Sequence, residues 1–348
     1  MSRQIEEISS EAKVAGAVVG IAIVLSAFAT LIFGGSYVTG MQAEDVQRSF
    51  RDMLAPPPYI EVEQGNEVAV AAFSSEGSMV VTVAAQGGAI RLWDTHYGMS
   101  VSSGIKGFHR DVNFVAFSPN GLKVITCGRN GSIAVWDVNS GDLKKLEISE
   151  KYYRNVTLSP DGRYIVTAED DGIQFWNTQS GELFRTLKGI RAPFTFSPDG
   201  RKIAAQGDDD SVHVFDSQSG KILRTMEGEG YSIYSIVFSS DGRKILGGGQ
   251  GTVRIWDVES GKVLQTLDIT WSKDDAITAA FSPDSNKILT TTRYGASAQI
   301  WDVVTGKKVR SISLGIFGGS IRNAAFSPDG RKVLTTGKTA RIWNLEWQ

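Results

Sequence analysis

Short stretches that alternate apolar and polar residues recur from Tyr59 to the C-terminus, with turn-forming residues between them. The stretches are rich in Val, Ile, Thr and Trp, and a period of two in such residues predicts β-strands with one buried face. Ser-Pro-Asp-Gly and related sequences lie between stretches, and their Pro and Gly preset the backbone angles of tight turns. The region 59–348 is therefore predicted to be all-β and built of consecutive hairpins.

One unit occurs seven times in this region. Each copy has an apolar residue before the first turn and, about 20 residues later, an aromatic residue followed by Asp or Asn. The copies begin at Phe73, Phe117, Leu158, Phe196, Phe238, Phe281 and Phe326, and their pairs are Trp93-Asp94, Trp136-Asp137, Trp176-Asn177, Phe215-Asp216, Trp256-Asp257, Trp301-Asp302 and Trp343-Asn344. Successive starts are 44, 41, 38, 42, 43 and 45 residues apart, close to the period of four-stranded propeller blades.

The two ends of the repeat region complement each other. Six copies carry Gly four residues after the Asp or Asn, at Gly98, Gly141, Gly181, Gly220, Gly261 and Gly306, where a further strand is expected to begin. The seventh copy stops at Gln348, the position where that Gly should be. The segment Tyr59 to Glu63 has strand character and no hairpin partner of its own. It is predicted to pair with Arg341 to Asn344 and to close the ring.

These seven copies resemble the WD-repeat (WD40) family, and the resemblance covers residues 59–348. It implies a seven-bladed β-propeller. Blades of this family often share a buried hydrogen-bond set of His, Ser or Thr, Asp and Trp. Only the second copy approaches that set, with His109, Thr126 and Trp136, and Asn130 stands where Asp is usual. The departure implies that apolar packing holds most blades, and a structural role is expected for His109.

An uncharged apolar run precedes the repeats. Residues 14–33 are dominated by Val, Ile, Leu, Ala and Phe, and roughly 20 such residues in a helix span the ~30 Å hydrocarbon core of a bilayer. The alternative is a cleaved signal peptide, but the preceding residues carry Glu6, Glu7 and Glu11 where a signal requires net positive charge. A single transmembrane helix that contacts the lipid bilayer through residues 14–33 is therefore predicted. Balanced charges on its two sides leave the side that holds the propeller undetermined.

Four segments follow from this organisation: a polar tail (1–13), the transmembrane helix (14–36), a juxtamembrane segment with a Pro-rich spacer (37–58) and the propeller (59–348). Within the helix, Gly16 and Gly20 form a GxxxG pattern that permits close approach of another membrane helix, although glycine is common in such helices without that role. The run Pro56-Pro57-Pro58 favours an extended, semi-rigid spacer.

Composition argues against several function classes. Lys and Arg number 36 against 38 Asp and Glu, so no net positive field would attract nucleic acid. One cysteine and three histidines leave few ligands for a metal. The sequence Gly337-Lys338-Thr339 lacks the earlier Gly of a phosphate-binding loop and is predicted to be a turn, and the run Asp208-Asp209-Asp210 is predicted to be a solvated turn. No catalytic residue, metal site or cofactor is expected, and the protein is not expected to be an enzyme.

The remaining candidate is a docking surface for other proteins, including integral membrane subunits. In similar propellers, the loops between blades and the turns between the second and third strands form one rim around the channel. Transferred by position, this rim holds Phe108, His109, Arg110, Tyr152, Tyr153, Arg154, Arg191, Tyr231, Tyr234, Trp271, Tyr294 and Phe317. Aromatic and Arg residues are enriched at interface hot spots, although such rings also pack between blades. A membrane-anchored scaffold is the leading hypothesis, with a sensor that binds a small ligand or peptide in the channel as the alternative and a propeller enzyme as a third.

Overall fold

A computed structural model of the chain describes residues 59–62, 67–85, 89–101, 112–128, 131–146, 153, 155–169, 172–207, 211–226, 233–269, 277–292, 297–313 and 320–345. The chain divides into two compact units, Met1–Pro57 and Pro58–Gln348, and every described residue belongs to the second. The predicted tail, membrane helix with Gly16 and Gly20, and spacer lie outside the described residues. The described part of the chain holds no helix with the length and hydropathy to cross a bilayer.

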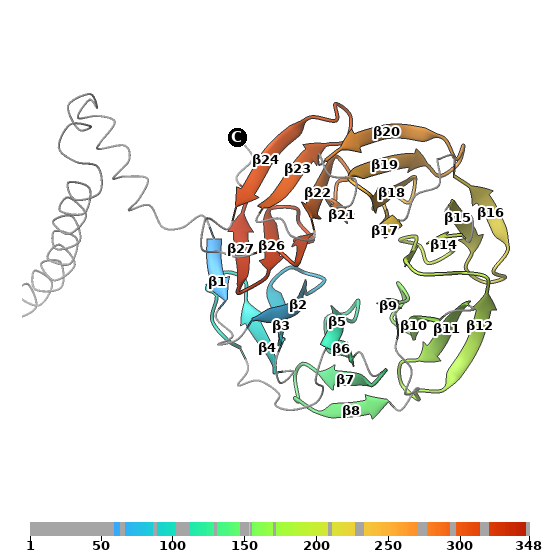
Figure 1. Ribbon diagram of the computed structural model, residues 1–348. Helices are drawn as coiled ribbons and strands as arrows, with labels where there is room; N and C mark the ends of the chain where they lie inside the picture. The colour runs from blue at the N-terminus through green and yellow to red at the C-terminus, as the bar shows by residue number, and fades with distance from the viewer. Residues whose placement is uncertain are drawn as a thin grey trace, which may run out of the picture. The chain divides into compact units, whose positions relative to one another are not determined.

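The described strands form seven antiparallel sheets around a central axis, which are the blades of a propeller (Figure 1). Blade 1 holds β2 (Val68–Phe73), β3 (Met79–Ala84) and β4 (Ile90–Asp94); blade 2 holds β5 (Val112–Phe117), β6 (Lys123–Gly128), β7 (Ile133–Asp137) and β8 (Leu143–Leu146); blade 3 holds β9 (Asn155–Leu158), β10 (Tyr164–Glu169), β11 (Gly172–Asn177) and β12 (Leu183–Lys188); blade 4 holds β13 (Phe194–Phe196), β14 (Lys202–Gln206), β15 (Val212–Asp216) and β16 (Ile222–Thr225). Blade 5 holds β17 (Ile233–Phe238), β18 (Lys244–Gly249), β19 (Thr252–Asp257) and β20 (Val263–Asp268); blade 6 holds β21 (Ile277–Phe281), β22 (Lys287–Thr292), β23 (Ser297–Asp302) and β24 (Lys308–Ser313); blade 7 holds β25 (Asn323–Phe326), β26 (Lys332–Thr336), β27 (Ala340–Asn344) and β1 (Tyr59–Val62). The prediction of seven blades is confirmed.

The position of a strand in its blade determines how deeply it is buried. The first strand lies nearest the centre of the ring and the fourth forms the outer edge (Figure 1). Five of the six residues of β6, a second strand, are buried, whereas all four residues of the outer strand β16 are exposed. A second strand is covered on both faces by neighbouring blades, which explains why these strands read as nearly continuous apolar runs.

The core consists of seven clusters of buried apolar side chains among the described residues, and each cluster joins two neighbouring blades. Between blades 1 and 2, for example, Leu92 belongs to the same cluster as Trp136. Between blades 7 and 1, Val62 and Ile342 cluster with Val80. Full burial of a Val, Leu or Ile side chain contributes about 1.5–3 kcal/mol. The blades are therefore held together by their seams and not by a single central core.

The strand β1 closes the ring by pairing with β27 of the last repeat. Tyr59 lies opposite Trp343 and Val62 lies opposite Ala340, in antiparallel register. The rings of Tyr59 and Trp343 have their centroids 4.5 Å apart. The predicted closure through the N-terminal strand is confirmed.

Polar side chains also stabilise the pairing of β1 with β27. Glu61 Oε1 lies 3.3 Å from Nε of Arg341, whose side chain is 14% exposed. The hydroxyl of Thr339 donates to Glu61 Oε1 at 2.6 Å. Residues 337–339 form the connection between β26 and β27, so this segment is a turn, as predicted.

A buried tryptophan–threonine hydrogen bond is a polar feature that the sequence analysis missed. In four blades the indole N–H donates to a Thr hydroxyl on the second strand: Trp93 to Thr82 at 2.7 Å, and Trp176 to Thr167, Trp301 to Thr290 and Trp343 to Thr335, each at 2.9 Å. In blade 2 the indole N–H of Trp136 and the hydroxyl of Thr126 have no hydrogen-bond partner within the described part of the chain. The copy that resembles the family's polar set most closely therefore lacks this bond, and His109 lies outside the described residues.

Two blades depart from the regular unit. In blade 1 the fourth strand expected after Gly98 is described only as a single bridge between Ser100 and Trp93. In blade 6, Ser285 occupies the turn position that glycine holds in the other repeats, with a φ of +57°. Its hydroxyl accepts the backbone N–H of Ser240, which stands where most repeats have proline, at 3.0 Å. A hydrogen bond thus replaces the proline–glycine contact that links neighbouring turns at five of the other seams.

Candidate functional site

The antiparallel order of each blade sends its connections to two opposite faces of the propeller. Turns between the first and second strands and between the third and fourth strands lie on one face, here named the turn face. Turns between the second and third strands, together with the loops between blades, lie on the other face, here named the loop face. The described residues include nearly all of the turn face and a smaller part of the loop face.

Three residues of the predicted docking rim are described, and they differ in position. Tyr153 is fully buried and packs in the cluster between blades 2 and 3, so its ring contributes to the core. Arg191 is exposed in the loop between β12 and β13. Tyr234, on β17, is 48% exposed. The remaining rim residues, namely Phe108, His109, Arg110, Tyr152, Arg154, Tyr231, Trp271, Tyr294 and Phe317, lie outside the described residues.

The first turn of each blade is organised by a buried serine. In blade 4, the hydroxyl of Ser197 donates to Asp199 Oδ1 at 2.6 Å and accepts the backbone N–H of Lys202 at 2.9 Å. The N–H of Arg201 also donates to Asp199 Oδ1, at 3.0 Å. The hydrogen bond from Ser197, followed by that from Arg201, lowers the pKa of Asp199 below its ordinary value. The equivalent serines, all buried, are Ser74, Ser118, Ser159, Ser239, Ser282 and Ser327.

The second turn of blades 1 to 6 uses the Asp or Asn that follows the aromatic residue. In blade 5, Ser260 donates its hydroxyl and its N–H to Asp257 Oδ1 at 2.6 and 2.7 Å, and these bonds lower the pKa of Asp257. In blade 3, the Oδ1 of Asn177 accepts the N–H groups of Gln179 and Ser180 at 2.8 and 3.0 Å. The turn therefore requires an acceptor oxygen and not a charge. These turn carboxylates are ionised near neutral pH and already hydrogen-bonded within their own turns.

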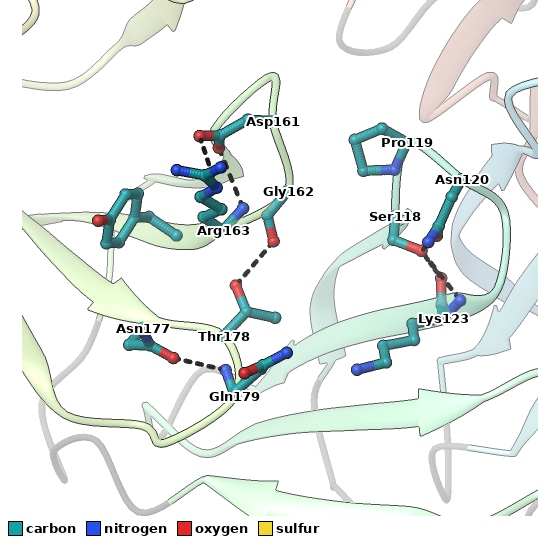
Figure 2. A pocket seen from close by; sticks show the side chains of 11 residues that line it. Ser118, Pro119, Asn120, Lys123, Asp161, Gly162, Arg163, Asn177, Thr178 and Gln179 are labelled. Atoms are coloured by element: carbon teal, nitrogen blue, oxygen red, sulfur yellow. Dashed lines mark hydrogen bonds and ion pairs between the residues drawn. The ribbon is translucent and has the colours of Figure 1, made fainter.

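Grooves lie on the turn face between neighbouring blades. The groove between blades 2 and 3 has a volume of about 440 Å³. It is lined by Ser118, Pro119, Asn120, Lys123, Asp161, Gly162, Arg163, Tyr164, Asn177, Thr178 and Gln179. Figure 2 shows the turns of the two blades on opposite sides of the groove, with the side chain of Lys123 directed toward Gln179.

A close contact between turns sets the width of this groove. Gly162 has a φ of +69°, and a Cβ atom there would lie only 2.8 Å from Cδ of Pro119 in the preceding blade. The hydroxyl of Thr178 donates to the carbonyl of Gly162 at 3.1 Å and thereby ties the two turns of blade 3 together. The walls of the groove are consequently fixed by backbone and proline ring atoms.

The same arrangement recurs at two other seams. Grooves of about 580 Å³ and 500 Å³ lie between blades 4 and 5 and between blades 6 and 7. Each groove is lined by a lysine from the earlier blade and an arginine from the later one: Lys123 and Arg163, Lys202 and Arg243, and Lys287 and Arg331. Such pairs can donate charge-assisted hydrogen bonds to carboxylate or phosphate groups, whereas the neighbouring aspartates are engaged in their turns.

Two side chains that often take part in catalysis, His213 and Cys127, are partnered or buried in the structure. His213 hydrogen-bonds to the hydroxyls of Ser211 and Thr225 on the outer part of blade 4. Cys127 is buried, and burial raises the pKa of its thiol to about 12. No group of three or more His, Cys, Asp or Glu side chains that could hold a metal is found in the described ranges. The arrangement supports recognition by shape, charge and hydrogen bonding.

Comparisons with known proteins agree with this architecture. The family model "WD domain, G-beta repeat" matches residues 102–137 and 220–257. The meiotic recombination protein rec14 of Schizosaccharomyces pombe is 37% identical over 97 residues, which cover 26% of this chain and 32% of that protein. The LST8 homolog of Drosophila melanogaster is 28% identical over 142 residues, 37% of this chain and 45% of that protein.

A third relative is a subunit of eukaryotic translation initiation factor 3 from Anopheles gambiae, which is 31% identical over 139 residues, 38% of this chain and 20% of that protein. The chain thus spans less than half the length of each of these relatives. Two repeats of the chain match the WD40-repeat model, and the seven four-stranded or nearly four-stranded blades agree with that similarity.

Proposed function

We propose that this protein is a membrane-anchored scaffold that docks other proteins on the loop face of its propeller, as an accessory or structural subunit of a membrane protein complex. The observation that carries the proposal is the closed ring, in which buried apolar clusters fill all seven seams. A ring closed in this way holds its surface connections on a rigid frame, and rigidly presented loops are where proteins commonly place their binding residues.

The proposed role involves no catalysis. The turn carboxylates that are described accept hydrogen bonds within their own turns, and their lowered pKa values make them poor proton donors near neutral pH. The thiol of Cys127 is inaccessible, and its raised pKa disfavours the reactive thiolate. One of the relatives is, by its name, a subunit of a larger factor, which favours a role in an assembly.

The proposed anchor is the uncharged run at residues 14–33, which has the length that a helix needs to cross the ~30 Å hydrocarbon core. The pattern formed by Gly16 and Gly20 would allow a second membrane helix to approach this anchor closely. The proposed partners therefore include integral membrane subunits as well as proteins that dock on the propeller.

Purification of the full chain from its native membranes in mild detergent tests this function. The protein is expected to stay in the membrane fraction after alkaline carbonate extraction and to co-purify with at least one other polypeptide in constant ratio. The loop-face variant Tyr234→Ser is expected to weaken that association, because it removes an aromatic ring that is 48% exposed.

The turn-face variant Phe184→Ser is a matched control, since its ring is 59% exposed and lies on the other side of the propeller. It should leave the ratio of the co-purifying polypeptide unchanged. Recovery of a lone monomer from membranes, or extraction of the chain by carbonate, would contradict the proposal.

A further inference from the structure

The groove between blades 2 and 3 has fewer carboxylates than the other two grooves on the turn face. Lys123 and Arg163 line it together with one carboxylate, that of Asp161. The other two grooves are each lined by two carboxylates, namely Asp257 and Glu259 in one and Asp284 and Asp329 in the other. The difference lies in the sequence, since Asn120 stands in the first turn where five other repeats have Asp, and Asn177 stands in the second turn where five others have Asp.

Both amide oxygens are used within their own turns. The Oδ1 atom of Asn120 accepts hydrogen bonds from the hydroxyl of Ser118 at 2.7 Å and from the backbone N–H of Leu122 at 3.2 Å. The Oδ1 atom of Asn177 accepts two backbone N–H groups at 2.8 and 3.0 Å. A backbone N–H only donates, so the oxygen of each side chain, and not its NH2 group, must face it. The two NH2 groups are left over, and neither donates a hydrogen bond within the described part of the chain.

The carboxylate of Asp161 is engaged in the same way. Its Oδ1 atom accepts hydrogen bonds from the hydroxyl of Ser159 at 2.6 Å and from the backbone N–H of Arg163 at 3.0 Å. Its Oδ2 atom lies 3.7 Å from Nε of Arg163, whose side chain is 78% exposed. The terminal nitrogens of Arg163 make no hydrogen bond to any residue that the structure describes. The acceptors on these turns are therefore largely occupied, whereas several donors are free.

The lysine of the groove lacks an acceptor that its counterpart has. Lys332 holds the same position in blade 7, and its ammonium donates to the carbonyl and the hydroxyl of Thr95 in blade 1 at 2.9 and 3.3 Å. Lys123 is only partly exposed and is directed toward Gln179 (Figure 2). The carbonyl of Gln179 already accepts the ammonium of Lys144. The ammonium of Lys123 makes no hydrogen bond or ion pair with the described residues.

One wall of the groove is aromatic. Tyr164 lines the groove, and the ring of Phe184 stacks on it with centroids 4.8 Å apart. A β-bulge positions Phe184, because the register of β11 and β12 shifts by one residue and leaves Phe184 without a residue across from it. The same shift occurs at Leu223 on β16, where the equivalent side chain lines the groove between blades 4 and 5. Tyr164 therefore presents a supported ring beside the two cations.

We propose that the groove between blades 2 and 3 binds an extended segment of a partner protein through an acidic side chain of that segment. The carboxylate of the segment accepts hydrogen bonds from Lys123 and Arg163, and such charge-assisted bonds are about twice as strong as neutral ones. The NH2 groups of Asn120 and Asn177 donate to backbone carbonyls of the segment, which need donors once water is displaced. Tyr164 packs against an apolar side chain next to the acidic one.

The charge of the groove favours a single carboxylate over a phosphate. Two cations and one carboxylate leave one positive charge among the lining residues. A phosphate carries about −1.5 to −2 charges at neutral pH, so it would exceed this charge and be repelled by Asp161. The free amide donors come in addition to the two cations, which favours a ligand with carbonyl groups as well as a carboxylate. An extended peptide has both.

This segment is a different partner from the one proposed for the loop face. The groove has a volume of about 440 Å³ and holds only a short stretch of chain. Interfaces that bury less than about 1,200 Å² are typical of weak, transient complexes. The complex is therefore not expected to survive purification, and the inference does not depend on the membrane anchor.

Selection from a phage-displayed library of random peptides on the full chain in detergent supplies the probe. Enriched peptides are synthesised with a fluorescein label, and fluorescence anisotropy measures their affinity. One class of enriched peptides is expected to contain Asp or Glu beside an apolar residue. Changing that residue to Asn or Gln should weaken binding by about tenfold, because the carboxylate no longer meets the cations.

Variants of the protein locate the site. Lys123→Gln and Asn177→Asp are each expected to weaken binding of these peptides by about tenfold. Asp holds the position of Asn177 in five other repeats, so Asn177→Asp retains the turn while it removes a donor and adds a negative charge. The matched controls Lys244→Gln and Asn344→Asp change the same repeat positions in blades 5 and 7, outside this groove, and should leave the affinity unchanged.

Three results would overturn the inference. The first is a selection that enriches no peptide, or only peptides that bind Lys123→Gln as tightly as the unchanged protein. The second is a set of peptides that depend on Lys123 but bind equally well without their carboxylate. The third is displacement of the peptide by free glutarate at the concentration at which the peptide itself binds, which would identify a small dicarboxylate as the ligand.

Discussion

Replacement of Gly98 by alanine is expected to weaken the seam between blades 7 and 1. Gly98 has a φ of +67°, and a Cβ atom there would lie 2.3 Å from Cγ2 of Ile60 on β1. Gly141 occupies the same turn position in blade 2 with a φ of +74°, but the nearest atom to its Cβ would be Trp136 Nε1 at 4.0 Å. The two substitutions share the backbone strain and differ in the clash with β1.

The magnitudes follow from these geometries. A left-handed backbone conformation costs an alanine about 1–2 kcal/mol, and an extra methyl group in a filled site adds a cost of about 1–3 kcal/mol. Gly141→Ala is therefore expected to lower the free energy of unfolding by about 1–2 kcal/mol, and Gly98→Ala by about 2–5 kcal/mol. The difference between the two variants measures the contact of β1 with blade 1.

Urea unfolding of the full chain in detergent, followed by tryptophan fluorescence, provides the measurement. Trp93 belongs to the cluster at this seam and Trp343 to the cluster on the other side of the closing blade, so their emission follows the unfolding of that blade. If the slope of the unfolding free energy against urea concentration is unchanged, the variants and the unchanged protein unfold in the same transition and their stabilities can be compared. The additional substitution Ile60→Ala removes the clashing methyl group and is expected to make the double variant less destabilised than the sum of the single ones. Equal losses for Gly98→Ala and Gly141→Ala, or strict additivity in the double variant, would refute the closing contact.

Three further predictions concern single side chains. Thr335→Val leaves a buried indole N–H without its acceptor and is expected to cost about 1–3 kcal/mol, whereas Thr126→Val removes a hydroxyl without a partner among the described residues and should be neutral or stabilising in the same urea assay. Because the pKa of Asp257 lies below the ordinary 3.8 in the folded state, its charge stabilises the protein above that pH and this contribution is lost as the pH falls through the folded value. The difference in urea unfolding midpoint between Asp257→Asn and the unchanged protein should therefore shrink from pH 7 to pH 3. A difference that stays constant would contradict this link between the ionisation of Asp257 and stability. Cys127 should resist Ellman's reagent at pH 8 until the protein unfolds, and fast reaction in the native state would contradict its burial.

Much of the fold could be predicted because the same strand and turn signals recur in each repeat. Turn residues at fixed offsets and alternating apolar residues define four strands, and their repetition predicts the number of blades. The closing strand could also be predicted, since the last repeat lacks a fourth strand and Tyr59 to Val62 supply one in the register that pairs Tyr59 with Trp343. Periodicity could not predict the reduced fourth strand of blade 1, described only as a bridge at Ser100, because strand pairing depends on the neighbouring strand as well as on local sequence.

The candidate site was less predictable. The rim was transferred by position, and position alone does not distinguish a ring on the surface from a ring in a seam. Tyr153 lies in a seam, whereas Arg191 and Tyr234 are exposed. The bulges that expose Phe184 and Leu223 were also missed, since a one-residue shift in register reverses which side chains face outward and leaves no mark in the apolar pattern.

The sequence by itself determined the repeat, the turns and the number of blades, since these depend on local backbone preferences and on the spacing of apolar residues. Only the tertiary structure decided which side chains meet across the seams. The tryptophan–threonine bonds, the pairing of Ser240 with Ser285 and the contact between Ile60 and Gly98 join positions that are set by the packing of strands. Such contacts depend on distances between elements, and a sequence pattern records only the order of residues along one chain.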